Sequence, residues 1–262
     1  MQKALVAGLA LGAVLPFLGT FVTLRKLSFL GDGIAHASLA GIAIGIVAAV
    51  NPFPVALAVG VSTGILVYIL ERKTSISSDA LVGVLFTGAL SFGLILMSMQ
   101  RGYQPELLSF LFGNILSIRA QDLWVILPLS AGIIGVLITY FRQFALLALD
   151  RETAGLYRVN TSPLDLLFYI LVSVAIVLGV KLLGVILVSA LLIVPPSIAK
   201  MIARSFRKMV VWSIVGAECF VILGLALSYM LDWPSGATIV LVGAGAFLLI
   251  AAMQGLTSTR RS

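Results

Sequence analysis

The chain has 262 residues, of which 61% are hydrophobic and 10% are charged, and its formal net charge at pH 7 is +7. A soluble domain carries roughly 25% charged residues, so these proportions, with a mean hydropathy of +1.17, exclude a soluble globular protein and indicate an integral membrane protein. The basic residues are scattered between apolar segments, so the charge reflects membrane topology, and no nucleic-acid partner is expected. The single cysteine, Cys219, excludes an intramolecular disulfide and a cysteine-rich metal site.

Nine segments are long and apolar enough to cross a membrane. A span needs about 20 mostly apolar residues, and it must be helical because backbone groups in lipid need internal partners. The sequence therefore predicts an all-α, polytopic membrane helix bundle that forms a single domain over residues 1–262. Only Lys181 separates the sixth and seventh segments, so a tight hairpin, a re-entrant segment and a total of eight spans remain open. The segments are 4–24, 33–50, 52–70, 79–99, 122–141, 163–180, 182–199, 209–231 and 236–255.

The connections between these segments divide the 17 lysine and arginine residues into groups of 13 and four. Because cytoplasmic loops carry an excess of Lys and Arg, the richer side is predicted to be cytoplasmic. The C-terminus is then cytoplasmic and, with nine spans, the N-terminus is outside. The cytoplasmic group is Arg25, Lys26, Arg72, Lys73, Arg142, Arg151, Arg158, Lys200, Arg204, Arg207, Lys208, Arg260 and Arg261, and the outer group is Lys3, Arg101, Arg119 and Lys181.

Two connections have features of their own. The outer stretch 101–121 contains the apolar piece Leu107–Gly113, which is too short to span and is predicted to lie at the interface or to dip back into the membrane. The inner stretch 142–162 is the longest cytoplasmic connection. Its core, Asp150–Tyr157, begins with a good N-cap residue and has an acid in its first turn, which predicts a short helix across the cytoplasmic face.

The only histidine, His36, follows Asp32 by four residues inside the apolar run Phe29–Gly41. On a helix these positions share one face. Ionisable groups are costly in a membrane and usually mark an ion path, and both side chains are ligands for first-row divalent metals, with imidazole suiting zinc. The structural alternative is that Asp32 caps a helix starting near Gly33 and that His36 only packs. Two ligands are too few for a closed, four-coordinate zinc site, which favours transient passage.

Other residues inside the predicted spans bear on packing. Pro195 and Pro196 remove two backbone donors and predict a kink, either static or acting as a hinge. Glu218 lies in mid-span and is either a hydrogen-bonded packing residue or part of an ion path. Small residues at helical spacing predict close approach of helices. The pairs are Gly8/Gly12, Gly41/Gly45 and Gly60/Gly64.

Four segments make the chain resemble the permease family of metal ABC importers, the membrane subunits of bacterial zinc and manganese uptake systems. Their order and spacing cover nearly the whole chain. The run Ala35–Leu39, with Asn51–Phe53 after it, is most similar to the zinc-uptake (ZnuB-type) branch. The segments are Leu24–Asp32 continuing to His36–Gly41, Phe110–Leu116, Asp150–Val159, and Gly184–Pro195 followed by Ala199.

This resemblance implies an ABC-importer permease fold in the bacterial cytoplasmic (inner) membrane. It implies a homodimer with the path at its axis, two cytoplasmic ATPase subunits, and an extracytoplasmic metal-binding protein, besides contact with membrane lipid. It associates Asp32 and His36 with the metal path, and it favours Asp150–Tyr157 as a coupling helix that docks on the ATPase over an ordinary amphipathic connector. The expected cargo is a divalent metal, most simply zinc, and no permanently bound cofactor is expected.

The chain is not expected to be an enzyme by itself. No G-x-x-x-x-G-K-[ST] phosphate-binding loop occurs, and nine spans leave no length for an ATPase domain. No nucleophile–base constellation accompanies His36. The alternatives are an ion-coupled secondary transporter, an ABC permease for a chelated metal or vitamin, and, more distantly, an intramembrane hydrolase.

Overall fold

The computed structural model of the chain describes residues 2–98, 120–149 and 161–258. Within these ranges every regular element is a helix, which confirms the predicted all-α class, and nine helices there are long and apolar enough to cross a membrane. The predicted pieces Leu107–Gly113 and Asp150–Tyr157 lie outside the described residues. The helices are α1 (Gln2–Leu24), α2 (Leu30–Val47), α3 (Pro52–Lys73), α4 (Ser78–Ser98), α6 (Ala120–Thr139), α7 (Phe141–Leu149), α9 (Thr161–Leu183), α10 (Val185–Ile202), α11 (Phe206–Leu231) and α12 (Ser235–Ser258).

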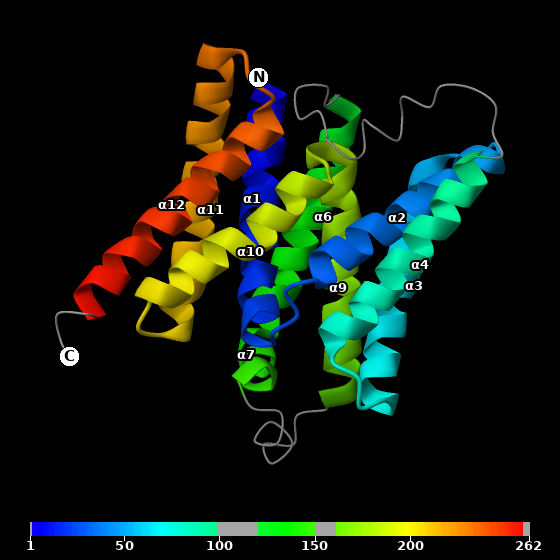
Figure 1. Ribbon diagram of the computed structural model, residues 1–262, viewed down its shortest axis with the longest axis horizontal. Helices are drawn as coiled ribbons and strands as arrows, with labels where there is room; N and C mark the ends of the chain where they lie inside the picture. Colours follow the sequence, from blue (N-terminus) through cyan, green and yellow to red (C-terminus); the bar gives the residue numbers. More distant parts are fainter. Residues whose placement is uncertain (1, 99–119, 150–160, 259–262) are drawn as a thin grey trace.

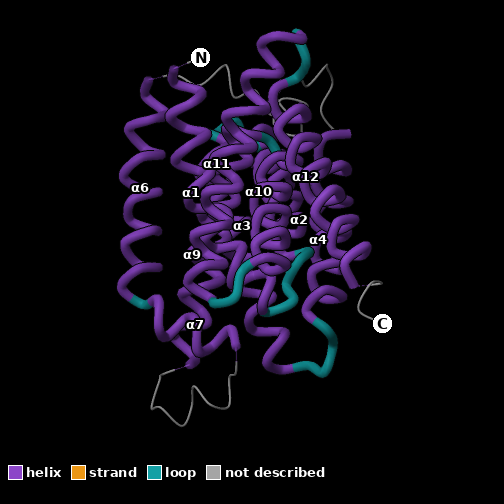
Figure 2. The backbone as a smooth tube through the Cα atoms, turned by 90° about the vertical axis from the view of Figure 1, so that its left-hand side faces the viewer, coloured by secondary structure: helices purple, strands orange, loops and turns teal. Residues whose placement is uncertain are grey.

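The helices form two sets joined by a central group. Figure 1 shows α2, α3 and α4 at one side of the molecule and α11 and α12 at the other, with α1, α6 and α9 between them and α10 crossing from the α11 and α12 side to the centre. α1 packs on α10 and α11, α2 packs on α3 and α4, and α9 packs on α3. In Figure 2 the long helices run broadly along one direction, and α7 lies below α6 at one end. This arrangement suits a bundle that spans a bilayer.

The sixth and seventh spans are separate helices, and the break between them is at Gly184 rather than at Lys181. α9 continues through Lys181 to Leu183, and Gly184 then has φ 80°. Glycine adopts this left-handed conformation without the steric cost that a Cβ would impose. α10 begins at the next residue and remains one helix through Pro195 and Pro196, so the predicted kink and hinge remain predictions.

Two of the three predicted glycine pairs, Gly41/Gly45 and Gly60/Gly64, allow the close approach that their spacing predicts. A Cβ on Gly41 would lie 2.6 Å from the Cα of Ala56, and one on Gly45 would lie 2.6 Å from the Cα of Pro52. α2 and α3 therefore meet backbone to backbone. Further along α3, a Cβ on Gly60 would lie 2.5 Å from the side chain of Val177 in α9. Lipid removes the hydrophobic driving force between helices, so their association depends on the close van der Waals packing that small residues at these contacts allow.

Helix α7 follows α6 after a single residue, and the sequence analysis did not anticipate it. It is held by a cluster of aromatic rings centred on Phe21 of α1. The Phe21 ring centroid lies 5.9 Å from that of Phe144 in α7, 6.2 Å from that of Phe168 in α9 and 5.3 Å from that of Phe206 in α11. The signal for α7 was the helical spacing of Phe141, the last residue of the predicted span, with Phe144 and Leu147 beyond it, both of which are buried.

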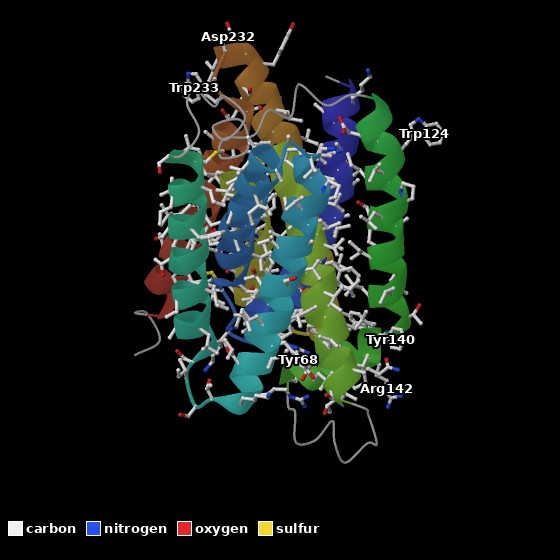
Figure 3. All side chains as sticks on the ribbon, turned by 90° about the vertical axis from the view of Figure 1, so that its right-hand side faces the viewer. Tyr68, Trp124, Tyr140, Arg142, Asp232 and Trp233 are labelled. Carbon is white, nitrogen blue, oxygen red and sulfur yellow. The ribbon has the colours of Figure 1, made fainter. Side chains whose placement is uncertain are left out.

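Aromatic residues mark the two ends of the bundle. Figure 3 shows Trp124 and Trp233 near one end and Tyr140 and Arg142 near the other. Trp and Tyr gather at membrane–water interfaces. Lys181 forms an ion pair with the first turn of α6, at the Trp124 end. Arg142 and Lys181 were predicted to lie on opposite sides of the membrane, and the structure places them at opposite ends of the bundle.

Candidate functional site

Asp32 lies in the first turn of α2, which begins at Leu30 and therefore one turn earlier than the predicted start near Gly33. In Figure 1 this end of α2 lies at about mid-height of the bundle, well away from the end formed by α7. The residue before the helix makes no side-chain capping bond, and the half-buried Asp32 carboxylate instead accepts a hydrogen bond at Oδ1 from the Ser189 hydroxyl of α10. The simple capping interpretation of Asp32 is therefore not what the structure shows.

α10 comes this close to Asp32 because the neighbouring positions are small. A Cβ on Gly31 would lie 2.7 Å from the end of the Leu192 side chain, so a larger residue there would force that side chain to move. α1 also meets the backbone of α10 closely, since a Cβ on Gly19 would clash with the Leu192 carbonyl oxygen and would lie 2.9 Å from the Pro196 ring. α10 is thus fitted between α1 and α2, with Ser189 directed at Asp32.

His36 lies one turn after Asp32 and faces α4. Its ring meets that of Phe86 edge to face at a centroid distance of 4.8 Å, and its Nδ1 is enclosed without a hydrogen-bond partner. Beside it is a cavity of about 240 Å³ whose other lining residues are apolar. The lining residues are His36, Leu39, Ala40, Leu90, Gly93, Leu94 and Met97. The cavity would admit a small cargo but offers it only the imidazole as a polar contact.

Asp32 and His36 present a carboxylate and an imidazole, both of the kinds that bind divalent metals, one turn apart on α2. Among the described residues no three His, Cys, Asp or Glu side chains come together as a possible metal cluster. A four-coordinate metal at this face would therefore need ligands other than the His, Cys, Asp and Glu side chains of the described residues. The pair suits a binding step that is weak enough to release its cargo.

Glu218 lies at the contact between α11 and α1, away from Asp32 and His36. It lies on α11 facing α1, where a Cβ on Gly12 would come within 3.2 Å of the Glu218 Oε1. Its Oε2 is enclosed without a hydrogen-bond partner. Glu218 therefore packs against α1, as one of the two predictions expected, but the hydrogen bond expected at Oε2 is absent. Asp32 and His36, by contrast, meet α10 and α4. The structure does not place Glu218 with them.

A polar cluster at the Tyr140 end of the bundle was missed by the sequence analysis. Arg25, in the turn after α1, forms an ion pair with Asp165 of α9 at 3.0 Å, and both side chains are nearly buried. The Tyr169 hydroxyl donates to Glu71 of α3. The available signal was Asp165 itself, an acid inside a predicted span, since such residues usually have a partner.

The same cluster extends along α3. The Tyr68 hydroxyl lies 2.8 Å from the Ser162 hydroxyl, and Arg72 donates to the Tyr68 hydroxyl at 2.6 Å. Figure 3 shows Tyr68 at this end of the bundle. The cluster therefore fixes the beginning of α9, which directly follows residues 150–160, to α3 and to the turn that leads into α2.

With this geometry established, comparison with known proteins identifies the family. The sequence profile of the ABC 3 transport family matches residues 1–254, and the chain belongs to that family. It is a multi-pass membrane permease, and the resemblance stated from its sequence is confirmed.

Individual relatives match over nearly their full length. The manganese transport system membrane protein MntC of Listeria monocytogenes is 30% identical over 264 residues, covering 100% of this chain and 94% of the relative. The high-affinity zinc uptake system membrane protein ZnuB of Haemophilus influenzae is 32% identical over 249 residues, covering 94% of each. Among solved structures, PsaBC from Streptococcus pneumoniae, in complex with Fab, matches with a TM-score of 0.83 and 28% identity over 95% of this chain and 90% of that chain.

Proposed function

We propose that this chain is the membrane-spanning permease subunit of an ABC importer for divalent metal, with Asp32 and His36 contacting the metal in transit. The observation that carries the proposal is an oxygen and a nitrogen ligand one turn apart on one face of α2, beginning at mid-height of the bundle. Imidazole and carboxylate are ligands for first-row divalent metals. The names of the relatives, which refer to manganese and zinc transport, support a metal cargo.

The remaining ligands come, in this proposal, from a second copy of the chain. Two copies of Asp32 and His36 would supply four ligands around a shared axis, which matches the coordination number that zinc prefers. The cavity beside His36 is formed by α2 and α4, and its other lining residues are apolar. This face of α2 and α4 is therefore suited to packing against the apolar surface of a second copy. Contact with lipid covers the rest of the outer face.

The energy source lies in partner proteins. ATP hydrolysis takes place in ATPase subunits bound to the cytoplasmic face, and an extracytoplasmic protein delivers the metal. The ATPase contacts residues 142–162, and the excess of Lys and Arg at that end of the bundle supports its cytoplasmic placement and that of the C-terminus. The polar cluster around Arg25 and Asp165 would connect this loop to the turn that leads into α2.

Zinc is the proposed main cargo because imidazole binds zinc more tightly than manganese in the usual affinity order. ZnuB, at 32% identity, is named for zinc uptake, but a manganese import permease is equally similar at 32%, so the proposal rests on the ligand chemistry and not on the identities. Manganese is the second candidate, because the Listeria relative of 30% identity is named as a manganese transport protein. Uptake of both labelled metals in the reconstituted complex with its own binding protein separates them. Transport of manganese at low concentration, with zinc acting only as a blocker, would reject zinc and leave the rest of the proposal intact.

The site itself is tested with Asp32→Ala and His36→Ala in cells that depend on this importer under zinc limitation. Both variants are expected to lose zinc accumulation while the protein remains in the membrane at normal levels. Asp232→Asn is the matched control, because it removes a carboxylate at the far end of α11, where φ is 52° and asparagine tolerates that conformation. Normal zinc accumulation by both site variants would refute the assignment.

A further inference from the structure

The hydrogen bond from Ser189 to Asp32 connects two segments that are 157 residues apart in the chain. Ser189 is half-buried on α10, at a depth where an isolated hydroxyl would be expected to bond to its own helix. The other half-buried serine of α10, Ser197, does so and donates to the Ile193 carbonyl at 2.7 Å. Ser189 instead directs its proton across the helix interface to a carboxylate. This difference within one helix indicates that the Ser189 side chain serves Asp32.

We propose that Ser189 is a positioning residue for the metal path, and that its hydrogen bond restricts Asp32 to one oxygen ligand and thereby favours zinc over manganese. The inference rests on the proposed metal contact of Asp32 and His36. The terminal torsion of an aspartate is broad, so a free carboxylate can turn to offer either one oxygen or both. A charge-assisted hydrogen bond to Oδ1 fixes that rotation and leaves Oδ2 as the free oxygen.

The number of oxygens offered bears on which metal is preferred. A single carboxylate oxygen beside an imidazole nitrogen suits the compact four-coordinate geometry of zinc. A carboxylate that binds through both oxygens raises the coordination number and the oxygen content of the site, which suits manganese better. Removing the Ser189 hydroxyl should therefore weaken zinc binding and weaken manganese binding less.

The expected loss of metal affinity can be estimated from residues in other proteins that hydrogen-bond to a metal ligand and orient it without touching the metal. Losing such a partner typically costs 10–100-fold in metal affinity. For Ser189→Ala we expect zinc affinity to fall by about tenfold or more, and the ratio of zinc to manganese affinity to fall by about tenfold. Ser189→Thr keeps a hydroxyl at this position and is expected to restore the ratio.

The experiment measures Zn²⁺ and Mn²⁺ binding in competition on the permease purified together with its ATPase and placed in lipid nanodiscs. The external binding protein is left out because it selects the metal before the permease does. Ser197→Ala is the matched control, since it removes a hydroxyl from the same helix that bonds only to its own backbone. It is expected to leave both affinities unchanged.

The outcomes are separable from those of the proposed function. If Asp32→Ala keeps wild-type binding of both metals, the metal assignment fails and this inference fails with it. If Asp32→Ala loses binding while Ser189→Ala keeps the wild-type ratio of zinc to manganese affinity, only the role of Ser189 is refuted. A lowered ratio in Ser189→Ala that Ser189→Thr restores supports the positioning role.

Discussion

The ion pair between Arg25 and Asp165 gives a prediction whose size can be worked from the structure. The two charged atoms are 3.0 Å apart, and the side chains are 11% and 7% exposed. At an effective dielectric constant of about 20, unit charges at this distance attract by about 5.5 kcal/mol. Much of that attraction is offset by the cost of removing both groups from water. The pair is therefore expected to matter mainly when only one partner is removed.

The expected pattern is a strong non-additivity. Removing one partner of a buried pair typically costs about 3–5 kcal/mol because the other charge loses its compensation. Asp165→Leu should thus lower the free energy of unfolding by roughly that amount, because it removes the carboxylate paired with Arg25. Arg25→Met should cost less, because Asp165 makes a further interaction. The double variant Arg25→Met/Asp165→Leu should lose much less than the sum, since two apolar residues of similar volume can replace a buried pair at little cost.

The assay is reversible unfolding of the purified chain in mixed micelles, with the four members of the double-mutant cycle measured side by side. A coupling energy of about 3 kcal/mol is expected. A matched control is the Lys181–Asp122 pair, which has the same 3.0 Å separation but is 35% and 22% exposed. Exposed pairs contribute about 0.2–1 kcal/mol. Equal coupling energies for the two pairs, or additivity at Arg25 and Asp165, would refute the reasoning from burial.

Three further outcomes test the packing and the topology. Gly41→Leu should prevent α2 from meeting α3 and abolish accumulation of the folded protein. Gly83→Ala is the control, because nothing lies within 4 Å of the added Cβ, and it should be tolerated. Expression level and thermal stability are measured for both variants. Phe21→Ala should lower the free energy of unfolding by about 3–5 kcal/mol, because it removes the ring that α7, α9 and α11 all contact. A loss under about 1 kcal/mol would show that the remaining rings repack and would contradict this prediction. A cysteine at Glu152, in a Cys219→Ser background, should resist membrane-impermeant thiol reagents in intact cells, and ready labelling from outside would overturn the proposed orientation.

Much of the fold follows from local properties of the sequence. Nine apolar stretches of sufficient length predict nine helices in lipid, and the structure has nine candidate spans in its described ranges. The glycines at helical spacing also predict where helices approach, as at Gly41 and Gly45. The shared face of Asp32 and His36 is a consequence of the helical repeat alone, so this half of the candidate site could be predicted without any tertiary information.

Helix boundaries were harder to predict where two apolar segments adjoin. Lys181 is the only charged residue between the sixth and seventh spans, yet α9 continues through it. Its ammonium group has two partners there: it lies 4.6 Å from the centre of the Phe53 ring and donates a hydrogen bond to Asp122. The break is at Gly184, which is the residue able to adopt φ 80° without strain. Similarly, α7 was hidden because hydropathy alone cannot separate a short docked helix from the end of a span.

Which polar groups meet was decided by the tertiary structure alone. Ser189 is one of several serines in apolar segments, and nothing in its local sequence distinguishes it from Ser197. Its contact with Asp32 depends on the reversal at Gly184 and on the space that Gly31 leaves for Leu192. The sequence by itself determined the class of protein, the spans and the spacing of the candidate pair Asp32 and His36, because hydropathy and the helical repeat act over neighbouring residues. The partners of Asp32 and Arg25 come from residues more than a hundred positions away, so only helix packing could select them.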